Sequence, residues 1–154
     1  MDALDAVGRG GASASEVSLI KELAKQTGLP LVRNAAAIAL ADLNAVGTGE
    51  LLIELLKRKE TRGANGTLLY ALRQMNAFAP LPVLIEILTE DRTYEALEGA
   101  LDLIANNAQR YSQEQKDEAV SRLRPLLTST AAHTSHSAKL AIKYLTGKSE
   151  SRRR

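Results

Sequence analysis

The sequence predicts an all-α fold: an α-solenoid, or superhelix, of about four antiparallel helix pairs. Apolar residues recur at three- and four-residue spacings, and no stretch shows sustained period-two alternation. The chain also partly overlays itself when shifted by 32 residues, a period typical of stacked helix pairs. Only 3% of the 154 residues are aromatic. The predicted core is therefore built of Leu, Ile, Val and Ala.

The first predicted pair follows a glycine-rich lead. Ser15 is expected to cap its first helix, because a serine hydroxyl can accept a hydrogen bond from a free backbone N–H. Gly28 and Pro30 are expected to end that helix, since both disfavour its continuation. The second helix is predicted from about residue 31 to residue 43.

The second predicted pair begins after the Gly47-Thr48-Gly49 break. Thr48 is expected to cap a helix with leucines at positions 51, 52, 55 and 56. The segment 63–66 contains two glycines and should break the chain before the next helix. That helix carries Leu68, Leu69, Leu72 and Met75.

The last two pairs are predicted on similar grounds. Pro80 and Pro82 fit the first turn of a helix, where a missing N–H costs little. A partner helix follows from about residue 94. Ser112 is expected to start a helix that runs to Leu127, with Pro125 bending its last turns. The final helix covers the region around residues 140–145.

The 32-residue shift also sets the expected register and boundaries. It aligns apolar residues of the first helices (Leu23, Leu55 and Ile87) and of the second helices (Leu40, Leu72 and Ile104). The fourth pair fits only with a shift near 39, so we expect it to act as a cap. We predict a flexible lead at 1–14, a solenoid domain at 15–146 and a basic disordered tail at 147–154.

One segment supports a family resemblance. Residues 32–43 read VRNAAAIALADL and match the pattern V-R-x-x-A-A-x-A-L-x-x-L at all seven specified positions. This resembles the second helix of a HEAT repeat of the phycobilisome-lyase type. The later pairs keep only the apolar positions, with Asn65 and Leu97 where Arg33 stands. The resemblance spans about residues 15–145. It implies a right-handed HEAT/armadillo-like superhelix whose second helices line the concave surface.

Residues that would carry chemistry are sparse. The absence of cysteine excludes thiol nucleophiles, disulfides and cysteine-bound metals. His133 and His136 could share a helix face and hold a metal, but no carboxylate lies near them in sequence, which favours a solvated turn. The sequon at Asn65 is interpreted as a turn. We therefore expect no catalytic residues, no metal and no cofactor, and a protein that is not an enzyme.

A stripe of acids is the first candidate binding feature. With Leu97 at the centre of the core stripe of its helix, Glu98, Asp102 and Glu95 fall at about 100°, 140° and 160° from it. By the HEAT resemblance, this stripe would face the concave groove. A solvated helix face is the alternative interpretation.

Two further residues share the position of Asp102 in the repeat. The 32-residue shift aligns Ile38 with Tyr70 and with Asp102, so each would point into the groove. An exposed aromatic beside an isoleucine is a plausible anchor for a partner, and Arg73 lies one turn away. The alternative is that Ile38 and Tyr70 pack sideways between neighbouring helices.

These features favour a non-enzymatic protein-interaction module, an adaptor, scaffold or inhibitor. Its partner would be a protein or peptide with basic and apolar character. Nucleic-acid binding, including a relation to HEAT-like DNA glycosylases, is the alternative, and a structural or engineered solenoid is another. The basic segment 57–62 and the arginine tail are secondary candidates. No secretory signal or membrane-length apolar run is evident, so we expect a cytoplasmic protein.

Overall fold

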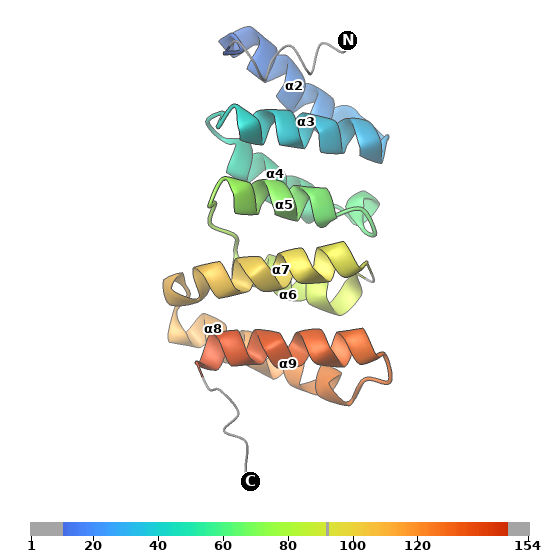
Figure 1. Ribbon diagram of the computed structural model, residues 1–154, viewed down its shortest axis with the longest axis vertical. Helices are drawn as coiled ribbons and strands as arrows, with labels where there is room; N and C mark the ends of the chain where they lie inside the picture. Colours follow the sequence, from blue (N-terminus) through green and yellow to red (C-terminus); the bar gives the residue numbers. More distant parts are fainter. Residues whose placement is uncertain (1–10, 92, 148–154) are drawn as a thin grey trace. The chain divides into compact units, whose positions relative to one another are not determined.

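The computed structural model describes residues 11–91 and 93–147, and within these ranges it contains eight α-helices and no strand (Figure 1). The predicted all-α class is confirmed. The chain divides into two compact units, residues 1–78 and 79–154. Most of the predicted lead and nearly all of the predicted tail lie outside the described residues.

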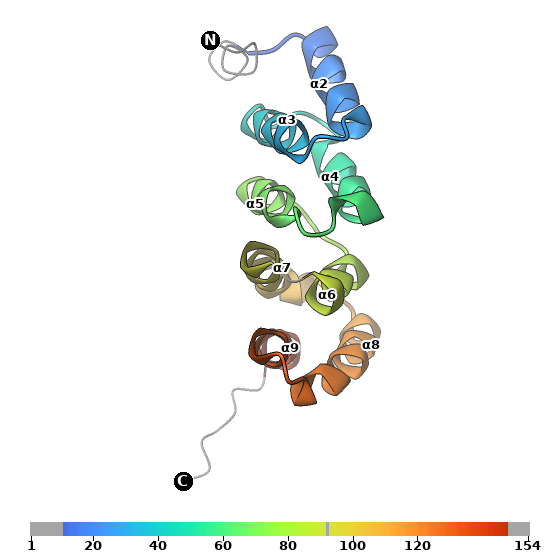
Figure 2. The same ribbon diagram turned by 90° about the vertical axis from the view of Figure 1, so that its right-hand side faces the viewer.

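The first unit contains two helix pairs. Its helices are α2 (Ala14–Gln26), α3 (Pro30–Asp42), α4 (Thr48–Leu56) and α5 (Gly66–Gln74). Within this unit α2 and α4 form one layer and α3 and α5 the other (Figure 2). The middle helix α3 packs against α2 and α5, and α4 packs against α5.

The second unit also contains two pairs. Its helices are α6 (Leu81–Glu90), α7 (Tyr94–Asn107), α8 (Gln113–Leu123) and α9 (Ala132–Thr146). Helix α7 packs against α6 and α9, and α8 packs against the same two helices. Ser112 caps α8 as predicted, because its hydroxyl accepts from the backbone N–H of Gln115 at 3.2 Å.

The same chain reversal ends α3 and α5. Asn44 and Asn76, 32 positions apart, adopt left-handed backbone conformations with φ of 46° and 49°. After each, an alanine N–H donates back into the helix: Ala45 to Leu40 O at 3.1 Å and Ala77 to Leu72 O at 3.0 Å. This is the hydrogen-bond pattern of the Schellman motif, which asparagine tolerates better than most residues. The predicted period therefore recurs in the backbone of the first unit.

Two predicted caps are wrong. Ser13, not Ser15, caps α2, because Glu16 three residues later completes a capping box with it. The Ser13 N–H donates to Glu16 Oε2 at 2.7 Å, and Glu16 N–H donates to Ser13 Oγ at 3.3 Å. In α4 the cap is Gly47, with φ 78°, and Thr48 is the first helical residue. Its hydroxyl is buried and has no hydrogen-bond partner within the described part of the chain.

The helix predicted to run from Ser112 to Leu127 is shorter than expected. Helix α8 ends at Leu123, and a 3₁₀ helix (Arg124–Thr128) replaces its predicted last turns. Pro125 explains the change, because it cannot donate the i→i−4 hydrogen bond that an α-helix requires there. Two more 3₁₀ helices, Lys59–Thr61 and Ala108–Arg110, follow α4 and α7.

The predicted register of the second helices agrees with the observed core. The aligned residues Leu40, Leu72 and Ile104 are all fully buried. In the first helices Leu55 and Ile87 are buried, whereas Leu23 is partly exposed. None of the helices in the two described ranges is long and apolar enough to cross a membrane.

Candidate functional site

Two side-chain hydrogen bonds join α3 to α5 on the side of these helices that carries Ile38 and Tyr70. Asn34 Nδ2 lies 3.2 Å from Thr67 Oγ1 and donates to it. Gln74 Nε2 donates to Asp42 Oδ1 at 2.6 Å. The partners stand 33 and 32 positions apart, at or within one residue of the predicted 32-residue period. Sequence reasoning missed these four residues, although their spacing was visible once the period was known.

Ile38 and Tyr70 lie between these two bridges. Ile38 is four residues from both Asn34 and Asp42, so its side chain falls on the same face of α3. Tyr70 stands three residues after Thr67 and four before Gln74 on α5, with the same consequence. The two predicted residues are therefore neighbours on one surface of the first unit.

Tyr70 is the exposed member of this pair. Its side chain is 49% exposed, whereas Ile38 is half-buried. The guanidinium carbon of Arg73 lies 5.6 Å from the centre of the Tyr70 ring, within cation–π range. This contact holds an aromatic ring and a cation together at the surface. Sideways packing between neighbouring helices, the alternative interpretation, therefore fits the half-buried Ile38 better than the exposed Tyr70.

Arg33 is a buried charged residue near the start of α3, directly before Asn34. It is buried, its Nη2 donates to the backbone carbonyl of Ala64 at 2.7 Å, and Nε and Nη2 donate to Asn34 Oδ1 at 3.1 and 2.8 Å. Burial lowers the pKa of the Arg33 guanidinium from its ordinary value. The arginine thus ties the start of α3 to the segment that precedes α5.

Replacing Arg33 with methionine should lower the free energy of unfolding by about 1.5–3 kcal/mol, the usual range for hydrogen bonds to a charged group. Methionine keeps much of the apolar contact, but it leaves the Ala64 carbonyl without this donor. Urea denaturation would measure the difference. The matched control is Arg122→Met on α8, where the arginine is exposed and a change within about 0.5 kcal/mol is expected. Equal effects of the two substitutions would contradict the structural role of Arg33.

The second unit carries the predicted acids on α7. Glu95 and Glu98 are exposed and Asp102 is half-buried, while Leu97 and Leu101 are buried. The predicted division of α7 into an apolar side and an acidic side therefore agrees with the burial pattern. The three acids belong to the second unit, and the Ile38–Tyr70 pair belongs to the first.

The other candidate residues lie in less suitable surroundings. His133 and His136 are exposed on the first turns of α9. Within the described ranges, no group of three or more histidines, cysteines or acids could hold a metal ion. Asn65 of the sequon is buried, as a turn residue can be.

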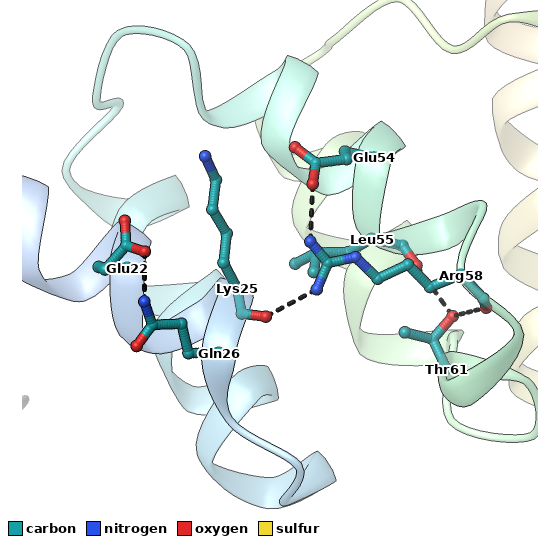
Figure 3. Close-up of polar contacts among 7 residues, drawn as sticks. All are labelled: Glu22, Lys25, Gln26, Glu54, Leu55, Arg58 and Thr61. Carbon is teal, nitrogen blue, oxygen red and sulfur yellow. Dashed lines mark hydrogen bonds and ion pairs between the residues drawn. The ribbon is translucent and has the colours of Figure 1, made fainter.

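In the basic segment 57–62, Arg58 bonds both to its neighbour Glu54 and to the end of α2. Arg58 donates to Glu54 at 2.6 Å and to the backbone oxygen of Lys25 at 2.6 Å (Figure 3). The hydroxyl of Thr61 donates to the carbonyls of Leu55 and Arg58 at 2.9 and 2.8 Å. The arginine tail lies outside the described residues.

Comparison with known proteins supports the fold and leaves the function open. No protein-family model matches the chain, and no curated protein matches its sequence. The structure is similar to the crystal structure of an engineered protein from the Northeast Structural Genomics Consortium, with a TM-score of 0.54. The sequences are 20% identical, and the match covers 94% of this chain and 72% of the other. At this identity the similarity concerns the all-helical fold alone.

Proposed function

We propose that this chain is a HEAT-like α-solenoid that acts as a non-enzymatic protein-interaction module. It binds its partner through the side of its second helices that, by the HEAT resemblance, would line a concave groove. The observation that carries the proposal is Tyr70, an exposed aromatic ring beside Arg73, set between two hydrogen bonds that join α3 and α5. Tyrosine and arginine are enriched among the residues that dominate binding energy at protein interfaces.

The two hydrogen bonds on either side of Tyr70 support this role in binding. Asn34–Thr67 and Asp42–Gln74 fix the two helices relative to each other on either side of the ring. A fixed anchor loses less conformational freedom on binding than a mobile one. The neighbouring Ile38 adds apolar area. The first unit therefore offers a partner an apolar anchor with a cation at its edge.

The acidic side of α7 supports a partner of basic character. Glu95, Glu98 and Asp102 place three carboxylates on one side of one helix, without a base at those positions. Such a surface attracts cationic segments and repels nucleic-acid phosphates. This favours a basic protein or peptide over nucleic acid as the partner.

The test is to identify a partner and ask which faces it uses. A pull-down with the intact protein is compared with one that uses a Tyr70→Ala, Asp102→Lys double variant. A true partner should be retained by the intact protein and lost by the double variant. If mixed oligonucleotides bind in a salt-dependent manner and no protein is lost in the double variant, nucleic-acid binding is the better assignment.

With a partner in hand, Tyr70→Ala should raise the dissociation rate and weaken binding by about 1.4–2.8 kcal/mol, or tenfold to a hundredfold. The substitution removes an apolar anchor, so the effect should vary little with salt. Surface plasmon resonance would measure both rates. Leu127→Ala is the control, because Leu127 is a 41% exposed apolar residue in the 3₁₀ helix after α8, which does not belong to the proposed surface.

Replacing Glu95, Glu98 and Asp102 together with neutral amides should act on the association rate instead. These carboxylates would steer a basic partner over about 8 Å at physiological salt, and added salt should weaken the effect. A control triple variant neutralises the three exposed acids of α8: Glu114, Asp117 and Glu118. Equal slowing by both triple variants would show that net charge, and not the α7 face, governs association.

A further inference from the structure

The outer side of α2 is built like a helix-packing surface. Leu19 is 70% exposed and Leu23 is 41% exposed. The residues 32 positions later, Leu51 and Leu55 of α4, are buried. Helix α2 therefore exposes the pair of leucines that the next first helix buries.

In α4 this leucine pair lies on the side that meets α2. At about 100° per residue, Glu54 falls within about 60° of Leu51 on α4, and it accepts a hydrogen bond from Arg58, which follows the end of the helix. Arg58 reaches α2 directly, because its Nη1 donates to the backbone oxygen of Lys25 at 2.6 Å (Figure 3). The two leucines are thus turned towards α2.

Helix α2 repeats this arrangement on its outer side. Gln26 Nε2 donates to Glu22 Oε1 at 2.6 Å, as Arg58 Nη2 donates to Glu54 Oε1 at 2.6 Å (Figure 3). Both bonds join residues four apart at equivalent positions of the repeat. We name this side of α2 the outer stripe; its members are Leu19, Glu22, Leu23 and Gln26.

The opposite side of α2 shows what kind of helix meets such a stripe. Lys21 donates to a backbone carbonyl in the loop before α4, and Ala24, which precedes Lys25 in the sequence, is buried. The pKa of the Glu54 carboxylate is lowered, first by its hydrogen bond from Arg58 and also by the positive charge of Lys25. A leucine pair with a nearby glutamate is therefore met by a helix side that combines a buried alanine with two lysines.

We propose that the outer stripe of α2 docks a helix of a partner protein, one that presents small apolar residues flanked by lysines or arginines. The leucines supply apolar contact, and Glu22 supplies the charge that Glu54 supplies on α4. A second copy of this chain fits less well, because the lysine side of its own α2 already meets its α4. This surface is separate from the faces of α3, α5 and α7, so either proposal can fail without the other.

A peptide of residues 13–28 is the probe, since this segment carries Lys21, Ala24 and Lys25. In the peptide, Leu19 and Leu23 are replaced by a lysine and a glutamate that are joined through a lactam bridge. The bridge stabilises the helix, and the replacement removes the leucines while leaving the lysine side available. Titration into the intact protein, followed by NMR, should shift the resonances of the outer stripe. A Leu19→Ser, Leu23→Ser double variant should weaken binding about tenfold or more. Leu31→Ser, at a leucine 85% exposed on α3, should leave it unchanged.

A charge exchange tests the orientation. Glu22→Lys should weaken binding of the peptide, and a peptide with glutamates in place of both lysines should restore it. Four results would overturn the proposal. One is the absence of binding at about 1 mM peptide, and the second is binding that the leucine variants do not change. The third is a dimer in sedimentation that the double variant abolishes, which assigns the stripe to a second copy. The fourth is peptide affinity that appears only after deletion of residues 1–10, which assigns the stripe to this chain's own N-terminal segment.

Discussion

Replacing Leu72 with alanine is expected to lower the free energy of unfolding by about 2–5 kcal/mol, the range for a leucine removed from a packed core. Leu72 is fully buried on α5, which packs against both α3 and α4. The substitution removes apolar contact and leaves a cavity that neighbouring helices fill only in part. Leu72 O also accepts the hydrogen bond that closes the turn after α5, and that bond should survive because it uses the backbone.

Chemical denaturation followed by circular dichroism would measure the loss. Leu31→Ala is the matched control, because the same atoms are removed from a side chain that is 85% exposed. The control should change stability by no more than about 0.5 kcal/mol. A loss below that value for Leu72→Ala would contradict the assigned register.

Tyr111→Phe is expected to destabilise the protein at neutral pH and to change its response to alkali. Tyr111 is buried, and its hydroxyl donates to the backbone carbonyl of Ala79 at 2.8 Å. Removing the hydroxyl leaves a carbonyl without this donor and should cost about 1–3 kcal/mol. Burial raises the pKa of Tyr111 well above its ordinary value, with a smaller opposing effect from Arg110.

The raised pKa fixes the direction of the pH effect. Below about pH 10 the tyrosine is protonated in both folded and unfolded chains, so its full contribution is present. Above that pH the unfolded chain releases the proton while the folded chain keeps it. Stability should then fall with rising pH, by up to about 1.4 kcal/mol per pH unit from this group.

Tyr111→Phe removes this dependence, so the stability difference between the two proteins should shrink between about pH 10 and pH 11. Thermal or urea unfolding across that interval would measure it. Tyr94→Phe serves as the control, because it removes the same hydroxyl from a side chain that is 71% exposed. A constant difference between wild type and Tyr111→Phe would show that the folded and unfolded chains bind this proton equally.

The apolar period predicted the buried positions of the second helices because burial follows directly from helical spacing. Leu40, Leu72 and Ile104 are buried as their alignment implies. Helix ends were harder to predict. Ser13 and Ser15 are equally good caps as residue types, and only the distance to Glu16 distinguishes them. At Thr48 a neighbouring glycine with a left-handed backbone takes the cap position.

The candidate surfaces were predictable only in part. The position of Tyr70 on an exposed face followed from the 32-residue shift, and the acidic side of α7 followed from helical spacing around Leu97. The bonds that frame Tyr70 depend on which residues of α3 and α5 come within hydrogen-bond distance. The outer stripe of α2 was also missed, because the same apolar spacing describes a buried stripe and an exposed one.

The bonds of Arg33 limit how freely the helix pairs could be exchanged during evolution or design. Repeats joined only by apolar contacts can be duplicated or reordered at little cost, since one leucine surface accepts another. Arg33 instead places a buried cation whose donors match one carbonyl, that of Ala64, and one amide, that of Asn34. Moved to a position where Leu97 now stands, the same arginine would require new acceptors or remain buried without them. The first and second pairs are therefore matched to each other, and a shuffled chain would have to carry them as one block.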